Sequence, residues 1–466
     1  MTKYPRGSEW RKWDLHIHSN ASDGLSSPKE IIDEAKKKGL SVIALTDHHT
    51  VDNVDEIKSL AEQENSGVTV IAGIEFRSEY GEKSVHFIGL FPDSHEGTIL
   101  NSTALRDLIL SPLGISKTAV IAKGRENDPT LDDDAAFKKG MFSVQVDFKE
   151  AANLIHRYGG VISIHNGSKS NGLDTEVKHQ GVGPHNVKEL CESLGTLKEE
   201  LLKKYVDICE IRKENDSESF YLDTFNLPSI AASDAHKTSE IGQKSVWIKA
   251  DPTFDGLKQI LYEPEDRVRI QEDCPEFKPM YNLIDKVSLN ENGFWNQDIL
   301  INENLNWYTI TYDLLYQEDD FASMSPGKQA FVILKLLLEF SSRKCPILID
   351  QPEDSLDNRA IYSELVSYLK TKKKERQIIL VSHNPNVVVG SDAEQVIVAN
   401  QNGIKTINQD NIKFQYISGS LENSSPKIVD ETCILLSQGI REHVCDILEG
   451  GKEAFNRREK KYGFMR

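Results

Sequence analysis

The sequence predicts an α/β fold, in which strands and helices alternate to form a parallel sheet or a β/α barrel. Short apolar segments such as 41–46 and 161–164 alternate with amphipathic helical segments along the first half of the chain. Strands that alternate with helices are typical of parallel sheets. Histidine or acidic residues directly follow several of these apolar segments, and barrel folds carry their reactive groups at the ends of strands.

The first helix can be justified residue by residue. Ser27 is the expected N-cap, Pro28 occupies the first helical position and Glu30 completes a capping box. Apolar residues at positions 31, 32 and 35 give the helix one side that can be buried. Gly39 is expected to end it.

The later elements follow the same alternation. Apolar strands are expected at 41–46, 68–72, 84–90, 161–164, 207–211 and 229–232. A helix at about 148–158 precedes the strand at 161–164. Between about 92 and 146 the alternation lapses, which predicts an inserted surface segment.

The composition suggests four regions. We expect a first α/β domain at 10–272, a linker at 273–306, a smaller α/β lobe at 307–423 and a helical, basic C-terminal tail at 424–466. The length of 466 residues is enough for about three average domains.

Composition and charge exclude several classes of protein. The 55 basic and 73 acidic residues give a net charge of −18, which disfavours non-specific coating of nucleic acid. No stretch approaches the ~18 apolar residues of a membrane helix, and no apolar leader follows the first basic residues. The six cysteines are scattered without paired spacing, which argues against a disulfide framework or a cysteine zinc site. We therefore expect a cytoplasmic protein with no membrane partner.

The strongest chemical signal is a set of histidines and carboxylates near strand ends. His16 and His18 are separated by one residue on the first strand, so both point to the same face and can bind one metal. The other candidate ligands are Asp23, His48, Glu75, His86, His165, Asp234 and His236. Mixed histidine and carboxylate ligands suit Zn, Mn or Fe, and the sequence does not choose among them.

In this order, over about 10–270, these residues resemble the PHP (polymerase and histidinol phosphatase) domain. The resemblance implies a distorted β/α barrel that holds two or three divalent metals and hydrolyses phosphoesters. It implies three groups of ligands: His16, His18, Glu75 and Asp234; Glu75, His86 and His165; and Asp23, His48 and His236. Such ions supply a nucleophilic water at neutral pH and neutralise charge on the phosphate.

The same resemblance suggests which residues take part in catalysis. Asp23 and Glu75 are candidate catalytic residues as well as ligands. Lys169 follows His165 in its loop, and Arg212 follows the strand at 207–211. Both are candidates to hold substrate phosphate, with a solvated basic side chain as the alternative for each.

The second lobe resembles the C-terminal half of an ABC/SMC-type ATPase. The candidate nucleotide-contacting residues are Ser325, Gly327, Gln329, Asp350, Glu353, Asp357 and His383. Position 351 is Gln where ABC proteins usually have the catalytic Glu, so Glu353 is the candidate in its place. The sequence contains no GxxxxGK[ST] phosphate loop, which argues against autonomous ATP hydrolysis.

Three roles remain open for this lobe. It is a degenerate remnant that dimerises or docks a partner, it completes a composite ATP site on a partner ATPase subunit, or it binds nucleotide weakly. The leading functional hypothesis is a metal-dependent nuclease or phosphodiesterase on DNA or RNA, in nucleic-acid processing or antiphage defence. The alternatives are a histidinol phosphatase-like phosphomonoesterase of a small metabolite, and a non-enzymatic assembly module.

Overall fold

The computed structural model describes most of the chain. The described residues are 8–64, 66–126, 128–177, 195–212, 218–275, 315–316, 319–340, 345–354, 356, 358–403, 412–429, 431 and 433–462. Most of the predicted linker at 273–306 lies outside them. The chain divides into two compact units, Met1–Glu276 with Ser418–Asn423, and Phe277–Ile417 with Ser424–Arg466. No helix among the described residues combines the length and apolar character needed to cross a membrane.

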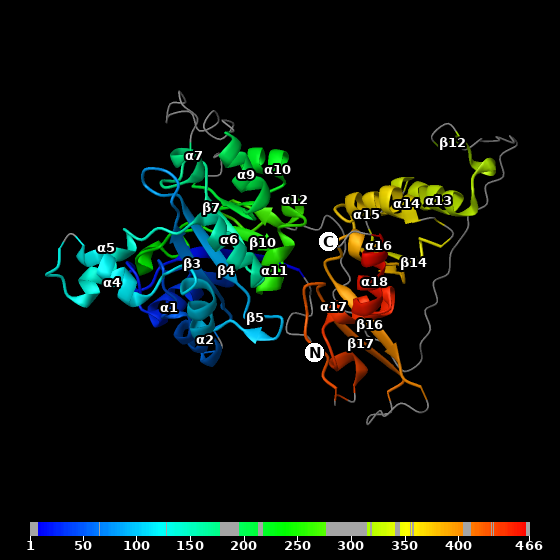
Figure 1. Ribbon diagram of the computed structural model, residues 1–466. Helices are drawn as coiled ribbons and strands as arrows, with labels where there is room; N and C mark the ends of the chain where they lie inside the picture. The colour runs from blue at the N-terminus through cyan, green and yellow to red at the C-terminus, as the bar shows by residue number, and fades with distance from the viewer. Residues whose placement is uncertain are drawn as a thin grey trace, which may run out of the picture. The chain divides into compact units, whose positions relative to one another are not determined.

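The first unit is built around a nine-stranded sheet in the order β11-β10-β1-β2-β3-β4-β7-β8-β9 (Figure 1). Its strands are β1 Trp10–Ile17, β2 Val42–Leu45, β3 Thr69–Arg77, β4 His86–Phe91, β7 Val161–His165, β8 Ile208–Glu210, β9 Ser229–Ile230, β10 Val246–Lys249 and β11 Val268–Arg269. The end strands β9 and β11 approach each other, so the sheet curls into a nearly closed barrel. The predicted α/β barrel is therefore present.

Helices cover the outside of this barrel. They are α1 Pro28–Lys37, α2 Val54–Gln63, α6 Phe148–Arg157, α7 Leu173–Glu176, α9 Thr196–Lys204, α10 Glu218–Phe225, η2 Thr238–Glu240, α11 Phe254–Gln259 and α12 Pro264–Arg267. The predicted capping box of α1 is confirmed, because the Ser27 amide donates to Glu30 Oε2 at 2.8 Å. Gly39 ends the helix with a positive φ of 68°.

The expectation of a fully parallel sheet is wrong. Strand β4 runs antiparallel to both β3 and β7, and β10 runs antiparallel to both β1 and β11. The short turn between Arg77 and His86 leaves no room for a crossover helix, and a parallel pair needs such a crossover. The consequence is functional, because the first residue of β4 lies beside the last residues of β3.

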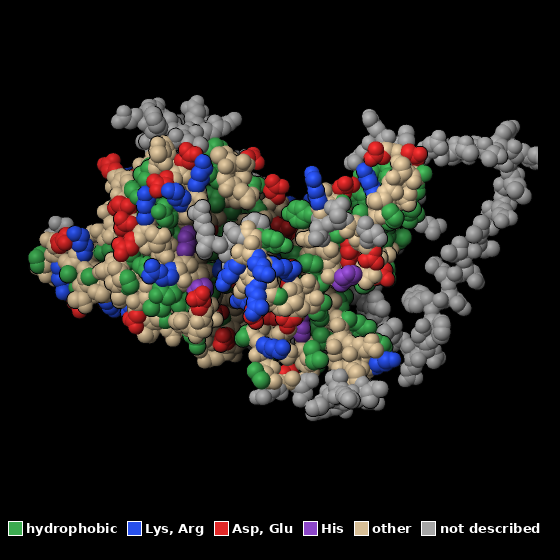
Figure 2. Space-filling model, turned by 45° about the vertical axis from the view of Figure 1, so that its right-hand side comes forward, with side chains coloured by type: hydrophobic (Ala, Val, Ile, Leu, Met, Phe, Trp, Pro, Cys, Tyr) green, Lys and Arg blue, Asp and Glu red, His purple; other side chains and the backbone are tan. Residues whose placement is uncertain are grey.

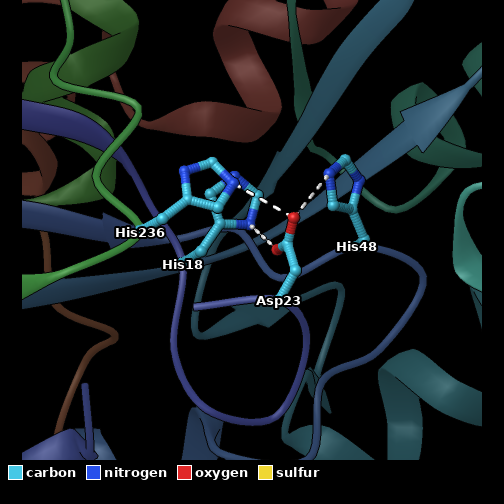
Figure 3. Close-up of side chains that lie close together, drawn as sticks. All are labelled: His18, Asp23, His48 and His236. Atoms are coloured by element: carbon cyan, nitrogen blue, oxygen red, sulfur yellow. Dashed lines mark hydrogen bonds and ion pairs between the residues drawn. The ribbon is translucent and has the colours of Figure 1, made fainter. Parts of the chain in front are cut away.

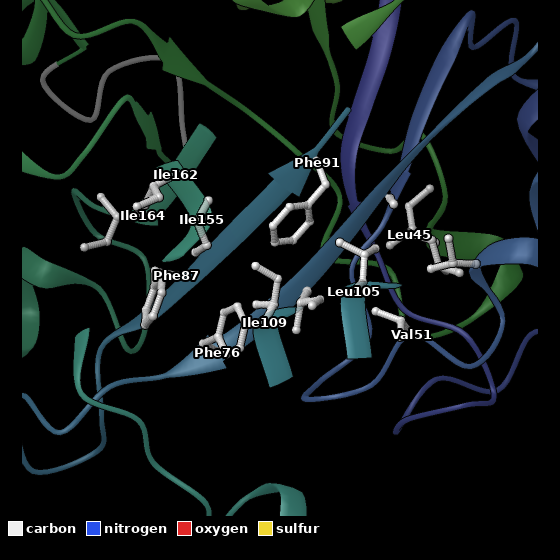
Figure 4. Close-up of a cluster of buried hydrophobic side chains, with 14 of the residues drawn as sticks. Leu45, Val51, Phe76, Phe87, Phe91, Leu105, Ile109, Ile155, Ile162 and Ile164 are labelled. Carbon is white, nitrogen blue, oxygen red and sulfur yellow. The ribbon is translucent and has the colours of Figure 1, made fainter. Parts of the chain in front are cut away.

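The barrel strands bury side chains on both faces. On β2, Val42 and Ala44 point to the inner core while Ile43 and Leu45 join the outer core beneath the helices. Figure 4 shows part of this outer core, in which Phe76, Phe87 and Phe91 pack with aliphatic side chains from several elements. Such apolar packing on both faces is typical of strands covered by helices.

The segment at 92–146 forms an insertion made of short strands and helices. Its elements are β5 Ser94–His95, β6 Thr98–Ile99, α3 Ser102–Leu105, η1 Arg106–Leu110, α4 Lys117–Arg125 and α5 Asp133–Met141. Helices α4 and α5 lie side by side (Figure 1). They cross in backbone contact, since a Cβ at Gly124 would lie 1.8 Å from the Ala136 carbonyl and one at Gly140 would lie 1.9 Å from the Val120 carbonyl.

A short segment from late in the sequence also belongs to the first unit. Ser418–Asn423 packs on it through two buried side chains. Ser420 Oγ donates to the Asp251 carboxylate, and Glu422 accepts from Ser8 Oγ at 2.7 Å and from Arg267 Nη1 at 2.9 Å. These six residues lie within the segment predicted as the second lobe.

The second unit has smaller sheets. Its elements are β12 Leu315–Tyr316, β13 Asp319–Asp320, η3 Phe321–Ser323, α13 Pro326–Phe340, β14 Ile347–Asp350, α14 Asn358–Ala360, η4 Ile361–Val366, α15 Ser367–Lys372, β15 Ile378–Val381, α16 Pro385–Gly390, β16 Val396–Gln401, β17 Phe414–Gly419, η5 Ile434–Leu436, α17 Ile440–Val444, η6 Cys445–Glu449 and α18 Lys452–Tyr462. Strands β14 and β15 are parallel, and one face of the pair packs on a small core around Phe331, Leu365 and Val387.

Candidate metal centre

The inner faces of four neighbouring strands bring site residues to one end of the barrel. Glu75 lies near the end of β3, His165 ends β7 and Glu210 ends β8. His86 begins β4 instead of ending it, and the antiparallel pairing of Arg77 with His86 places it at the same end. The barrel interior beneath them is apolar, so the polar groups are confined to this end.

His16 and His18 enter from β1 and converge as their spacing predicts. Their Nε2 atoms are 3.0 Å apart, and Glu75 Oε2 lies 3.2 Å from the first and 3.1 Å from the second. Three atoms with lone pairs therefore face one point. Asp234 Oδ1 adds a fourth oxygen at 3.4 Å from His16 Nε2 and 3.6 Å from His18 Nε2.

One buried group of side chains, which we call the inner cluster, consists of His16, His165 and Glu210. All three side chains are buried. His16 Nδ1 donates to the Glu210 carboxylate at 3.1 Å, which leaves Nε2 free to face the centre. Burial alone would lower the pKa of His16, but the carboxylates of Glu210, Asp234 and Glu75 raise it to about 9. These carboxylates thus favour a positive charge at His16.

A second group, which we call the outer cluster, consists of His18, Asp23, His48 and His236 (Figure 3). Asp23 lies between the imidazoles, with Oδ2 3.1 Å from His236 Nε2 and 3.9 Å from His48 Nε2, and Oδ1 3.5 Å from His18 Nδ1. The hydrogen bond to Asp23 raises the pKa of His236. The outer cluster has more access to solvent, because the His236 side chain is 39% exposed.

Glu75 connects the groups. Its Oε1 accepts from His86 Nδ1 at 2.7 Å, and its Oε2 lies 3.4 Å from His48 Nε2. Although burial opposes ionisation, His48, His16 and His86 hold the pKa of Glu75 well below its usual range. The structure places His165 in the inner cluster, while its Nε2 is also 3.7 Å from Glu75 Oε1.

The donor set fits divalent metal ions. Both ring nitrogens of the buried His165, and Nδ1 of both His18 and His48, have no hydrogen-bond partner among the described residues. A buried polar atom without a partner is costly unless something binds it. The backbone of Asp234 has a φ of 55°, in the left-handed region that residues other than glycine adopt infrequently. Backbone conformations of this kind cluster at functional sites.

The two predicted phosphate-binding residues differ in their surroundings. Lys169 is buried and forms an ion pair with Glu210, and its Nζ lies 3.5 Å from Asp234 Oδ2. Arg212 is exposed and lies two residues after the end of β8. Its role in binding phosphate stays a prediction.

The sequence analysis missed two residues of this centre. Glu210 lies inside the apolar strand 207–211. An acidic residue at an inward position of a buried strand is the sequence pattern that could have identified it as a site residue. Arg77 lies two residues after Glu75 in β3, so the two side chains point to the same face of the strand. Its Nη1 donates to His86 Nε2 at 2.9 Å, and its Nε has no hydrogen-bond partner among the described residues.

In the second unit, the acidic segment 350–354 at the end of β14 lies next to His383, which follows β15. Glu353 is buried and accepts from Ser382 Oγ at 2.5 Å and from the His383 amide at 3.3 Å. Gln351 Nε2 lies 3.3 Å from His383 Nδ1, and Asp350 is exposed at the end of β14.

The remaining predicted nucleotide-contacting residues are less informative. Ser325 and Gly327 lie at the start of α13, and Gln329 Nε2 donates to the Phe321 carbonyl at 2.9 Å. Asp357 lies outside the described residues. The nucleotide roles of the whole set stay predictions.

Comparison with solved structures adds little. A two-domain protein from Bacteroides vulgatus ATCC 8482, described as containing a PHP-like metal-dependent phosphoesterase, is 19% identical with a TM-score of 0.35 and covers 56% of this chain and 65% of its own. A structure from a study of SMC ATPases is 19% identical with a TM-score of 0.18 and covers 22% of this chain and 56% of its own. Neither superposition is close enough to bear on function, and the ATPase resemblance stays a prediction.

Sequence comparison is more informative. A 5'-3' exoribonuclease of Haemophilus influenzae is 38% identical over 86 residues, and a 3',5'-nucleoside bisphosphate phosphatase of Chromobacterium violaceum is 36% identical over 83 residues. Each match takes in 18% of this chain and only 31% and 28%, respectively, of the length of these relatives.

A third relative matches over most of its length. The uncharacterized protein MJ1587 of Methanocaldococcus jannaschii is 32% identical over 171 residues, which is 33% of this chain and 88% of that protein. Residues 14–159 match the family described as PHP domain, and residues 212–261 match the one described as PHP-associated. The chain therefore belongs to the PHP-domain family of metal-dependent phosphoesterases.

Proposed function

We propose that this chain is a metal-dependent phosphodiesterase that acts on nucleotides, most simply as a nuclease of DNA or RNA with two or three divalent ions. The observation that carries the proposal is the convergence of all nine predicted ligands, with Glu210, into overlapping groups at one end of the barrel. His16, His18, Glu75 and Asp234 would hold one ion, Glu75, His86 and His165 would hold a second, and Asp23, His48 and His236 would hold a third. Glu210 would fix the His16 imidazole through Nδ1. Zn, Mn or Fe suits this donor set.

Basic residues near these groups suit a phosphate. Arg77 is half-buried beside His86 and does not pair with a carboxylate among the described residues. A guanidinium in that position can bind phosphate oxygens through two parallel hydrogen bonds. Lys169 is the second candidate, with its amine held close to the centre by Glu210.

Charge elsewhere on the chain gives modest support for a nucleic-acid substrate. Helix α18 carries basic residues in its last turn. The basic segment 370–376 at the end of α15 is less available, because Lys372 pairs with Glu339 and Lys373 with Asp392. Figure 2 shows one dense patch of lysine and arginine side chains on the face in view, while elsewhere on that face basic side chains alternate with acidic ones. Patches of this kind can contact phosphates of a longer strand.

A phosphomonoesterase of a small metabolite is the second candidate. The relative from Chromobacterium violaceum is named as a bisphosphate phosphatase, and the net charge of −18 suits a small substrate better than a long polyanion.

For the second unit we propose a role in dimerisation or regulation, as a degenerate ATPase-like lobe. The alternative is that it completes the ATP site of a partner subunit. In either case the biological setting would be nucleic-acid processing or antiphage defence. Binding of ATP by the chain alone is not proposed, since the sequence lacks a phosphate loop.

The test is a hydrolysis assay of the full chain supplemented with Mn, Zn or Fe. Labelled single- and double-stranded DNA, RNA and a panel of small phosphomonoesters would be compared, each with and without ATP. Metal-dependent cleavage of an oligonucleotide that is lost in His16→Ala supports the nuclease. Release of phosphate only from small esters supports the second candidate instead, and no hydrolysis at all contradicts both. His383→Ala is the matched control, because this histidine lies in the second unit and should not affect ATP-independent hydrolysis.

A further inference from the structure

One exposed aromatic side chain touches the outer cluster. Phe142 is 46% exposed, and its ring packs edge to face on His48 with 5.8 Å between centroids. Single exposed apolar residues are common on protein surfaces and need no explanation by themselves. The informative feature here is position, since a phosphate bound at His48 would lie within one side-chain length of this ring.

The insertion holds Phe142 in place from both sides. Phe142 is the C-cap of α5, which is fixed against α4 by the backbone contact at Gly140. On its other side, the Val146 amide donates to the Arg77 carbonyl at 2.9 Å, and Gln145 Nε2 donates to Ser84 Oγ at 2.5 Å. The ring is therefore presented to the site by a rigid scaffold that is anchored next to β3.

We propose that Phe142 is a stacking platform for the base of a nucleotide whose phosphate occupies the metal centre. The inference rests on the proposed function and names its substrate class as nucleotides that carry a base, in preference to sugar phosphates without one. Every nucleobase has a flat face that can stack on an aromatic ring, so this contact gives affinity without sequence preference. Lys138 and Lys139 lie in the last turn of α5 and supply positive charge for a neighbouring phosphate.

Phe142 would then be a specificity-determining residue, and the insertion at 92–146 would take part in substrate binding. The inward face of the barrel binds the phosphate, while the α4–α5 hairpin contributes the surface for the base. A structural role for Phe142, as a support for the His48 ring, would instead affect metal content and would slow all substrates alike.

The test compares substrates that differ only in the base. The first pair is a deoxyadenosine decamer and a decamer of abasic tetrahydrofuran phosphates with the same charge. The second pair, for a phosphomonoesterase, is adenosine 5'-monophosphate and ribose 5-phosphate. The full chain, Phe142→Ala, Phe142→Tyr and the control Tyr262→Ala would each be assayed for kcat/KM and for bound metal. Tyr262 is an exposed aromatic residue of the same unit, between α11 and α12.

We expect Phe142→Ala to lower kcat/KM on the base-containing member of the hydrolysed pair by about 10-fold and on the baseless member by less than about 2-fold. Phe142→Tyr and Tyr262→Ala should retain the preference, and metal content should not change. An equal loss on both members, or no loss on the first, overturns the role of Phe142 and leaves the proposed function standing. If the chain cleaves only RNA in the assay above, an oligoadenylate RNA and its abasic counterpart replace the first pair. Hydrolysis of no substrate in either assay overturns the proposed function and this inference together.

Discussion

The inner and outer clusters use the same kinds of side chain in different surroundings. In the inner cluster, His16 and Glu210 have at most 1% of their surface exposed, and the carboxylate fixes the imidazole. In the outer cluster, 15% of the Asp23 side chain and 39% of the His236 side chain are exposed. An ion bound at His16 as proposed would therefore be out of reach of solvent, whereas one bound at the outer cluster would be open to solvent and substrate.

The largest expected effect comes from removing His16, which belongs both to the inner cluster and to the group formed with His18, Glu75 and Asp234. His16→Ala should lower hydrolysis by about a thousandfold or more, because ion binding supplies several kcal/mol of transition-state stabilisation. Asp234→Ala should act in the same direction. The measurement is steady-state hydrolysis together with bound metal and thermal unfolding. A variant that unfolds but keeps its full metal content would contradict the assignment.

Removing the support of His16 should have an intermediate effect. Glu210→Gln should weaken metal affinity by about 10- to 100-fold, because a carboxylate that hydrogen-bonds to a ligating imidazole fixes its tautomer and orientation. The measurement is a competition titration with a metal-binding dye. Since Lys169 would lose its buried partner, the double variant Glu210→Gln, Lys169→Met separates metal affinity from stability. Unchanged affinity in both variants would show that Glu210 does not act through His16.

The outer cluster should lose its ion more readily. In His236→Ala we expect the bound metal to fall by about one equivalent while the ion at His16 remains, because none of the proposed ligands of that ion is changed. Metal analysis after dialysis against increasing chelator would check this. Loss of all metal in a single step would break the distinction between the clusters.

The smallest expected effect is a difference in pH dependence. Ligation requires a neutral imidazole, so protons compete with the ion below the pKa of the metal-free histidine. That pKa is about 9 for His16, so the metal affinity of the inner cluster, which contains His16, should rise with pH up to about 9. The pKa of His236 is also raised, so affinity at the outer cluster should rise with pH above the usual value of 6.5. Calorimetric titration at several pH values measures both, and pH-independent binding would contradict the protonation states inferred for these histidines.

The fold class and the candidate ligands could be predicted because strands and their polar ends leave a strong sequence pattern. His16 and His18 are an example, since their spacing places both on one face of a strand. Glu210 left a weaker pattern, because a single acidic residue inside an apolar strand indicates a site only once the inward positions of that strand are known. The direction of β4 was missed for a similar reason: whether two strands are joined by a turn or by a crossover depends on the length of the connection, and strand composition does not record it.

The segment Ser418–Asn423 has a practical consequence for anyone who would shorten this chain. The barrel is discontinuous in sequence, so a fragment that ends at residue 276 would lack six residues of its own folding unit. In such a fragment Arg267 would lose its ion pair with Glu422, and Asp251 would lose the hydroxyl of Ser420. Arg267 would keep Glu263 and Asp251 would keep Arg11 nearby, but each buried charge would lose a buried partner, which is destabilising. Catalytic studies of an isolated barrel would therefore need this peptide restored, either by fusion through a short linker or by keeping the chain whole.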